Sequence, residues 1–85
     1  MKEYVRLATM IILYTQDHCP YCDKVKKVFS ERRIVYEERN IKYSEFLKEV
    51  QSHNARTMPF MVDPQANVAM GESDEIIAYA SEYAF

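Results

Sequence analysis

The segment Met10–Tyr14, of sequence MIILY, constrains the fold of this chain more than any other part of it. It is rich in β-branched residues and has no alternating polar positions, which is typical of a strand buried on both faces of a sheet. A strand of this kind is covered by other elements on each side. The segment therefore predicts a central strand in an α/β domain.

Apolar residues recur at helical spacing after this strand, between Pro20 and about Arg33, and proline suits the first turn of a helix. The apolar positions of this predicted helix are Cys22, Val25, Val28 and Phe29. The segment Ile34–Arg39 is then predicted as a second, less buried strand, because its charges alternate with apolar residues. A strand, a helix and a strand in this order form a right-handed parallel unit.

A second amphipathic helix is predicted from Ser44, a candidate cap, to about His53. Its apolar stripe, which should pack against the sheet, consists of Tyr43, Phe46, Leu47 and Val50.

The C-terminal part predicts a β-hairpin and a helix. The strands are residues 60–62 and 68–70, and Asp63 and Pro64 suit the first two positions of a type I turn between them. Ser73 is a candidate cap for the last helix, whose apolar positions are Ile76, Ile77, Ala80 and Tyr83. The predicted order is therefore βαβαββα around a four-stranded mixed sheet.

Length and composition indicate one small domain, because 85 residues with 48% hydrophobic and 28% charged content suffice for a single core. We expect residues 1–85 to form it, with residues 1–9 as an N-terminal extension whose role the sequence does not specify. A net charge of −2 disfavours nucleic acid as a partner. No run approaches the roughly 20 apolar residues of a membrane helix, so we expect no membrane partner. We also expect the protein to be cytoplasmic and monomeric.

The only two cysteines, Cys19 and Cys22, lie where the first strand ends and the first helix begins. Open α/β sheets place their active sites at this point, and a helix N-terminus favours a thiolate. A disulfide between residues so close together closes a very small loop and adds little stability, so reactivity explains the pair better. Cys19, nearer solvent, is the expected nucleophile, and Cys22, on the buried face, the expected resolving thiol.

Other polar residues near the cysteines each have two possible roles, one functional and one structural. Lys24, Lys26 and Lys27 either stabilise a thiolate or form a solvated helix face. His18 either takes part in proton transfer or is an incidental loop residue. We expect no metal site, because zinc would need a second closely spaced pair of ligands and an iron–sulfur cluster needs four ligands.

Three motifs in this order resemble the glutaredoxin family, of the dithiol CPYC type, over nearly the whole chain from Met10 onward. They are CPYC at residues 19–22, Thr-Met-Pro at residues 57–59, and Gly-Glu-Ser-Asp at residues 71–74. The resemblance implies a thioredoxin-like fold with three α/β/α layers. It also implies that the Met58–Pro59 peptide bond is cis and that its loop lies against the nucleophilic cysteine.

The resemblance further implies glutathione as a co-substrate, with no tightly bound cofactor. Its cysteinyl backbone would pair with the proline loop, and its γ-glutamyl carboxylate would lie at the start of the last helix. The implied glutathione-binding residues are Tyr21, Arg56, Thr57, Met58, Pro59, Ser73 and Asp74. Two positions depart from the family pattern: Gln16 stands where many glutaredoxins have lysine, and Glu72 replaces the second glycine of a Gly-Gly pair.

The function expected from this resemblance is glutathione-dependent reduction of protein disulfides and glutathione mixed disulfides. Expected partners are disulfide or glutathionylated proteins, with ribonucleotide reductase as one candidate. The alternatives are a glutaredoxin-like protein reduced by thioredoxin reductase, or a carrier of a glutathione-ligated iron–sulfur cluster. The first usually has an aromatic residue and a proline where this chain has Glu72 and Ser73, and the second usually has a monothiol CGFS motif.

Overall fold

Between residues 10 and 83, four strands pair in the order β2-β1-β3-β4. They are β1 (Ile11–Thr15), β2 (Tyr36–Asn40), β3 (Phe60–Asp63) and β4 (Val68–Met70). The central strand β1 runs parallel to β2 and antiparallel to β3, and β3 is antiparallel to β4. The mixed sheet and the central position of β1 are therefore confirmed. This computed structural model describes residues 10–83, so the predicted N-terminal extension, residues 1–9, lies outside the described part.

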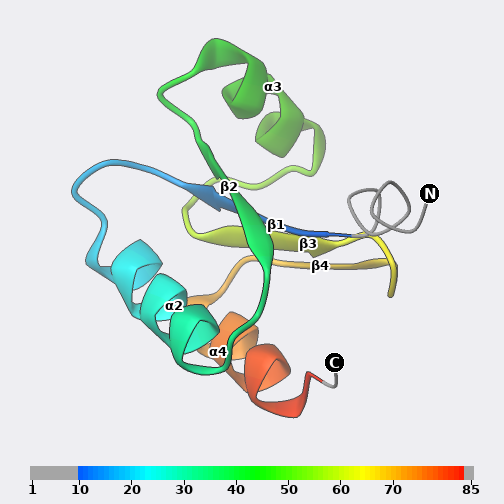
Figure 1. The fold of residues 1–85 in the computed structure, drawn as a ribbon. Coiled ribbons are helices and arrows are strands. Elements are labelled where there is room, and N and C mark those ends of the chain that lie inside the picture. The colour runs from blue at the N-terminus through cyan, green and yellow to red at the C-terminus, as the bar shows by residue number, and fades with distance from the viewer. Residues whose placement is uncertain (1–9, 84–85) are drawn as a thin grey trace.

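Within the described residues, three helices cover the two faces of this sheet: α2 (Pro20–Glu31), α3 (Ser44–Ser52) and α4 (Ser73–Glu82). Figure 1 shows α2 and α4 side by side on one face and α3 on the opposite face. The predicted βαβαββα order and the three α/β/α layers are confirmed. None of the helices within residues 10–83 is long and apolar enough to cross a membrane.

Side chains of β1 and β3 alternate between two buried clusters, as expected for strands with both faces covered. Ile11, Leu13 and Met61 pack with residues of α2 and α4 in one cluster. Tyr14 and Phe60 pack with the cysteines and with residues of α3 in the other. The cysteine pair is thus built into the cluster on the α3 side.

The second strand begins at Tyr36, two residues later than predicted. Ile34 is buried, but its N–H donates to the carbonyl oxygen of Phe29 at 2.9 Å, and Arg33 has a φ of 59°. This arrangement ends α2 with a left-handed residue followed by an apolar contact back to the helix. Ile34 therefore completes the helix end instead of entering the sheet.

The predicted serine caps are wrong for both α3 and α4. Ser44 and Ser73 are the first helical residues, and the N-cap positions belong to Tyr43 and Glu72. Neither N-cap side chain makes a capping hydrogen bond within the described residues. The first N–H groups of α4 are therefore left without a side-chain cap.

The hairpin between β3 and β4 is confirmed, but its turn lies one residue later than predicted. The N–H of Asn67 donates to the carbonyl oxygen of Pro64 at 3.4 Å, and Asn67 has a φ of 57°. Asp63 is 2% exposed and pairs with Val68 in the sheet. Burial keeps Asp63 in the strand, so the turn spans Pro64 to Asn67.

Candidate functional site

The cysteine pair lies at the junction between the loop after β1 and the first turn of α2, as predicted. Cys19 is the N-cap of α2, and its Sγ accepts a hydrogen bond from the N–H of Cys22 at 3.1 Å. Pro20 occupies the first turn, where its missing N–H costs nothing. The two cysteines form a disulfide in this structure, with their Cα atoms 5.2 Å apart. The helix start thus directs a backbone donor at the sulfur of Cys19.

Both sulfur-bearing residues are largely covered. Cys19 is 5% exposed and Cys22 is 1% exposed, so Cys19 is the more accessible of the two, but only by a small margin. They pack in one cluster with Tyr14, Met58 and Phe60. Apolar surroundings exclude water from the disulfide while leaving Cys19 at the edge of the cluster.

The proline loop lies directly against Cys19, which confirms that expectation. The Met58–Pro59 peptide bond is cis, and the Met58 carbonyl oxygen lies 3.8 Å from Cys19 Sγ. Among residues 10–83, the N–H of Met58 forms no hydrogen bond. An unpaired backbone donor beside the sulfur is what an extended substrate chain could pair with.

The start of α4 reaches the same region because Gly71 allows a close approach. A Cβ atom at Gly71 would lie 3.3 Å from the ring of Phe60, which follows the cis-proline directly. Lys24 Nζ of α2 lies 3.6 Å from Asp74 Oδ1 in the first turn of α4. The third motif is thereby joined to the helix that carries the cysteines.

The residues that the resemblance implied for glutathione differ in accessibility. Met58 and Pro59 are buried, Ser73 is half-buried, and the other four are exposed: Tyr21, Arg56, Thr57 and Asp74. Tyr21, at 63% exposure, stands beside the cysteines on the outer surface of the helix start. The four exposed members present polar groups to solvent, whereas Met58 lies against the buried sulfur of Cys19.

The lysines after the cysteines have separate environments. Lys24 pairs with Asp74, whereas Lys26 Nζ lies 3.2 Å from Glu38 Oε2. The same Glu38 oxygen accepts a hydrogen bond from the buried Thr15 hydroxyl at 2.8 Å. Lys26 therefore connects α2 to the sheet, through an ion pair that neither of its two interpretations included.

Gln16 and His18 precede the cysteines in the exposed loop. His18 has a φ of 55°, in the left-handed region that histidine adopts more readily than most residues. Gln16 is exposed and uncharged, so this side of the site lacks the cation that many glutaredoxins have there.

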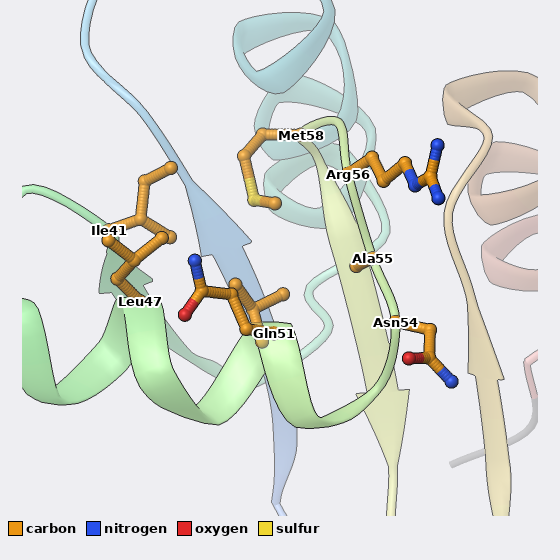
Figure 2. Close-up of a pocket in the computed structure, with 8 residues that line it drawn as sticks. Ile41, Leu47, Gln51, Asn54, Ala55, Arg56 and Met58 are labelled. Carbon is orange, nitrogen blue, oxygen red and sulfur yellow. The ribbon is translucent and has the colours of Figure 1, made fainter.

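Sequence reasoning missed a groove next to the proline loop, with a volume of about 540 Å³. We call it the α3 groove, and its interior is lined by Ile41, Leu47, Val50, Gln51, Ala55 and Met58. Asn54 and Arg56 also line it, and we call their side of the groove the rim because Figure 2 shows both side chains directed outward. In Figure 2, Met58 and Gln51 extend into this space from opposite sides, whereas the Arg56 guanidinium is directed away from both. The only signal in the sequence was the apolar stripe of α3, which was assigned to packing.

Comparisons with known proteins agree with this geometry. Residues 13–84 match the family model described as glutathione S-transferase, N-terminal domain. Glutaredoxin 1 of Rickettsia felis is 49% identical over 39 residues, which make up 46% of this chain and 36% of that relative. The matching segment thus spans little more than a third of the relative's length.

Solved structures share the fold at low sequence identity. NrdH-redoxin from Escherichia coli, a glutaredoxin-like protein, has a TM-score of 0.73 and 18% identity, with 89% of this chain and 97% of that one covered. Glutaredoxin 1 from Francisella tularensis has a TM-score of 0.65 and 24% identity, with 86% and 93% covered. The chain therefore belongs to the glutathione S-transferase N-terminal domain family, has a thioredoxin-like fold, and is similar to glutaredoxin 1 over 39 residues.

Proposed function

We propose that this protein is a thiol-disulfide oxidoreductase that reduces protein disulfides and glutathione mixed disulfides. The observation that carries the proposal is the position of Cys19 Sγ, which accepts the Cys22 N–H and lies 3.8 Å from the Met58 carbonyl. A backbone N–H at a helix start stabilises a thiolate, the reactive form of cysteine. The adjacent cis-proline loop offers backbone groups to a substrate.

The reaction is a two-electron exchange that begins from the reduced dithiol. Cys19 thiolate attacks one sulfur of the substrate disulfide, a new S–S bond forms, and the other substrate sulfur leaves as a thiolate that takes up a proton. Cys22 thiolate then attacks the sulfur of Cys19 and releases the second substrate thiol. The protein is left with the Cys19–Cys22 disulfide seen here, and two glutathione molecules reduce it again while becoming glutathione disulfide.

Glutathione as the electron donor is supported at the start of α4. The first N–H groups of this helix have no side-chain cap within the described residues, so they suit the γ-glutamyl carboxylate. Ser73 and Asp74 would bind the γ-glutamyl end, with Asp74 facing its ammonium group. Tyr21, Thr57, Met58 and Pro59 would flank the cysteinyl part, and Arg56 would pair with a carboxylate. No tightly bound cofactor is needed for this chemistry.

A second donor, thioredoxin reductase, is favoured by two residues that reduce positive charge at the site. Gln16 supplies no cation, and Glu72 adds a carboxylate at the N-cap of α4, where an anionic ligand would bind. The fold similarity to NrdH-redoxin, whose activity profile is described as thioredoxin-like, agrees with this candidate. Ribonucleotide reductase is one protein substrate to test with either donor.

Cysteine variants test the roles of the two sulfurs. We expect Cys19→Ser to abolish all turnover, because the remaining thiol, Cys22, is only 1% exposed and too buried to attack a substrate disulfide. Cys22→Ser should still remove glutathione from a glutathionylated peptide, which needs one thiol, and should lose reduction of protein disulfides. Equal loss of both activities in the two variants would contradict the assignment.

Coupled assays test the electron donor. NADPH oxidation is followed with a small glutathione mixed disulfide, first with glutathione and glutathione reductase and then with thioredoxin reductase alone. We expect turnover in the first system. Turnover only in the second would exclude glutathione and leave the thiol-disulfide exchange itself in place.

A further inference from the structure

The α3 groove has apolar lining residues that glutathione has no side chain to cover. Glutathione has a glycine after its cysteine, so it has no side chain to place in an apolar space beside the proline loop. The groove has a volume of about 540 Å³, within the usual range for small-molecule sites, and its lining includes Ile41, Leu47 and Met58. Apolar surface of this kind gains free energy only when a matching apolar group covers it.

We propose that the α3 groove binds a large aliphatic or aromatic side chain next to the target cysteine of a protein disulfide, with an acidic residue beside it. The proposal rests on the proposed thiol-disulfide exchange and specifies its substrate. It makes the chain selective for protein segments with a particular flanking sequence.

Continuity between the groove and the redox site is the first argument. The carbonyl of Met58 lies 3.8 Å from Cys19 Sγ, and the side chain of the same residue lines the groove. Figure 2 shows that side chain extending toward Gln51 on α3. A substrate chain that pairs with the backbone of Met58 therefore passes the groove within one or two residues of its cysteine.

Charge is the second argument, because Arg56 is the only charged residue among the described residues that line the groove. Arg56 is exposed and makes no ion pair with any other residue in the range 10–83. Its position at the rim, directed away from the apolar interior, leaves it available to a carboxylate outside the groove. Unpaired rim charges favour partners of opposite sign.

Symmetric peptide disulfides test the proposal in single-turnover reactions with the fully reduced protein. Each reaction converts one peptide disulfide and one protein dithiol into two peptide thiols and the protein disulfide, so no further reductant is needed. The peptides carry leucine or serine on both sides of the cysteine, with glutamate outside them, and a third peptide carries leucine with lysine. We expect the leucine–glutamate peptide to react about tenfold or more faster than the serine–glutamate peptide. The leucine–lysine peptide should be slower than its glutamate counterpart.

Variants of the α3 groove test whether a preference for the leucine peptide arises from this surface. Gln51→Trp fills the space from an exposed position on α3, and Leu47→Gln makes the interior polar at similar size. Both should reduce the leucine preference to within about twofold. The matched control Gln65→Trp, on the exposed hairpin turn, should retain the full preference. Thermal unfolding of each variant verifies that it is folded.

The outcomes separate this inference from the proposed function. Equal rates for the leucine and serine peptides, or a leucine preference that both groove variants retain, would overturn the inference alone. Failure to reduce any peptide would overturn the proposed exchange as well. Sedimentation of the wild-type chain is a further check, because a dimer that Gln51→Trp dissociates would show that a second copy occupies the groove.

Discussion

The two faces of the sheet are packed to different degrees. On the face that α2 and α4 cover, the central residues are almost completely buried, and Val25, Phe29 and Met61 each have 0% exposure. On the face that α3 covers, Phe46 and Leu47 of that helix are only half-buried. Within residues 10–83, α3 is the one helix that covers the second face, and the α3 groove lies beside it.

The two faces of the sheet therefore have different roles: one stabilises the fold, and the other contains the redox site. The cluster under α2 and α4 contains neither cysteine, whereas the cluster under α3 contains both, together with Met58 of the cis-proline loop. A tightly packed face can fix the ends of β1, β3 and α2, and thus the position of Cys19. A partly open face is then free to admit a substrate, as expected for low-density regions near functional sites.

Truncation of one apolar side chain on each face should give the largest difference in the free energy of unfolding. Phe29→Ala removes a ring that is 0% exposed and lies 5.0 Å, centroid to centroid, from the ring of Tyr36. It should lower the free energy of unfolding by about 3–5 kcal/mol. Leu47→Ala, from a half-buried position, should cost less than about 2 kcal/mol. Urea unfolding measures both, and equal losses would show that the faces contribute equally.

Removal of one tyrosine hydroxyl from each face compares the same two faces through smaller losses of stability. Tyr79 donates to Asp63 Oδ2 at 2.5 Å, and the other oxygen of this buried carboxyl has no partner among the described residues. Tyr79→Phe leaves both oxygens unpaired and should cost about 1–3 kcal/mol. Tyr14 donates to Glu49 at 2.9 Å, but Glu49 also accepts from Arg39 at 2.7 Å.

Tyr14→Phe should therefore cost no more than about 1 kcal/mol, because Glu49 keeps its charged partner. Equilibrium unfolding in urea gives both values under the same conditions. A larger loss for Tyr14→Phe than for Tyr79→Phe would contradict the view that the α2 and α4 face contains the less replaceable contacts.

The fold was largely predictable because its strongest signals are local. The apolar run MIILY and the helical spacing after Pro20 depend only on neighbouring residues, and both elements formed as predicted. The errors came from tertiary contacts that no local pattern contains. Ile34 was assigned to a strand but completes the end of α2, and the hairpin turn moved by one residue because Asp63 is buried against Tyr79.

The candidate site was predictable in its motifs and less so in its surroundings. The helix-start position of Cys19 and the cis bond before Pro59 were both expected. The pairing of Lys24 with Asp74 joins residues fifty positions apart, so spacing along the chain could not reveal it. The α3 groove likewise depends on how α3 is placed over the sheet.

Alkaline pH should affect the α2 and α4 face through Tyr79. Burial, and then the hydrogen bond to Asp63, raise the pKa of Tyr79 to about 12 from its ordinary value of 10.0. The unfolded chain therefore loses this proton near pH 10 while the folded chain retains it, so stability falls as pH rises from 10 toward 12. Tyr79→Phe should make the loss of stability less steep above pH 10. An unchanged slope in urea unfolding at several pH values would contradict this.

The smallest effect on stability is expected at the exposed pair between α2 and α4. The side chains of Lys24 and Asp74 are 58% and 88% exposed, so Asp74→Asn should change the free energy of unfolding by less than about 1 kcal/mol. If Asp74 faces the γ-glutamyl ammonium group, the same change raises KM for a glutathione mixed disulfide several-fold and leaves kcat nearly unchanged. Glu75→Gln, in the same helix turn, is the matched control and should alter neither parameter. Equal KM effects from both changes would show that only the general charge of this helix start matters.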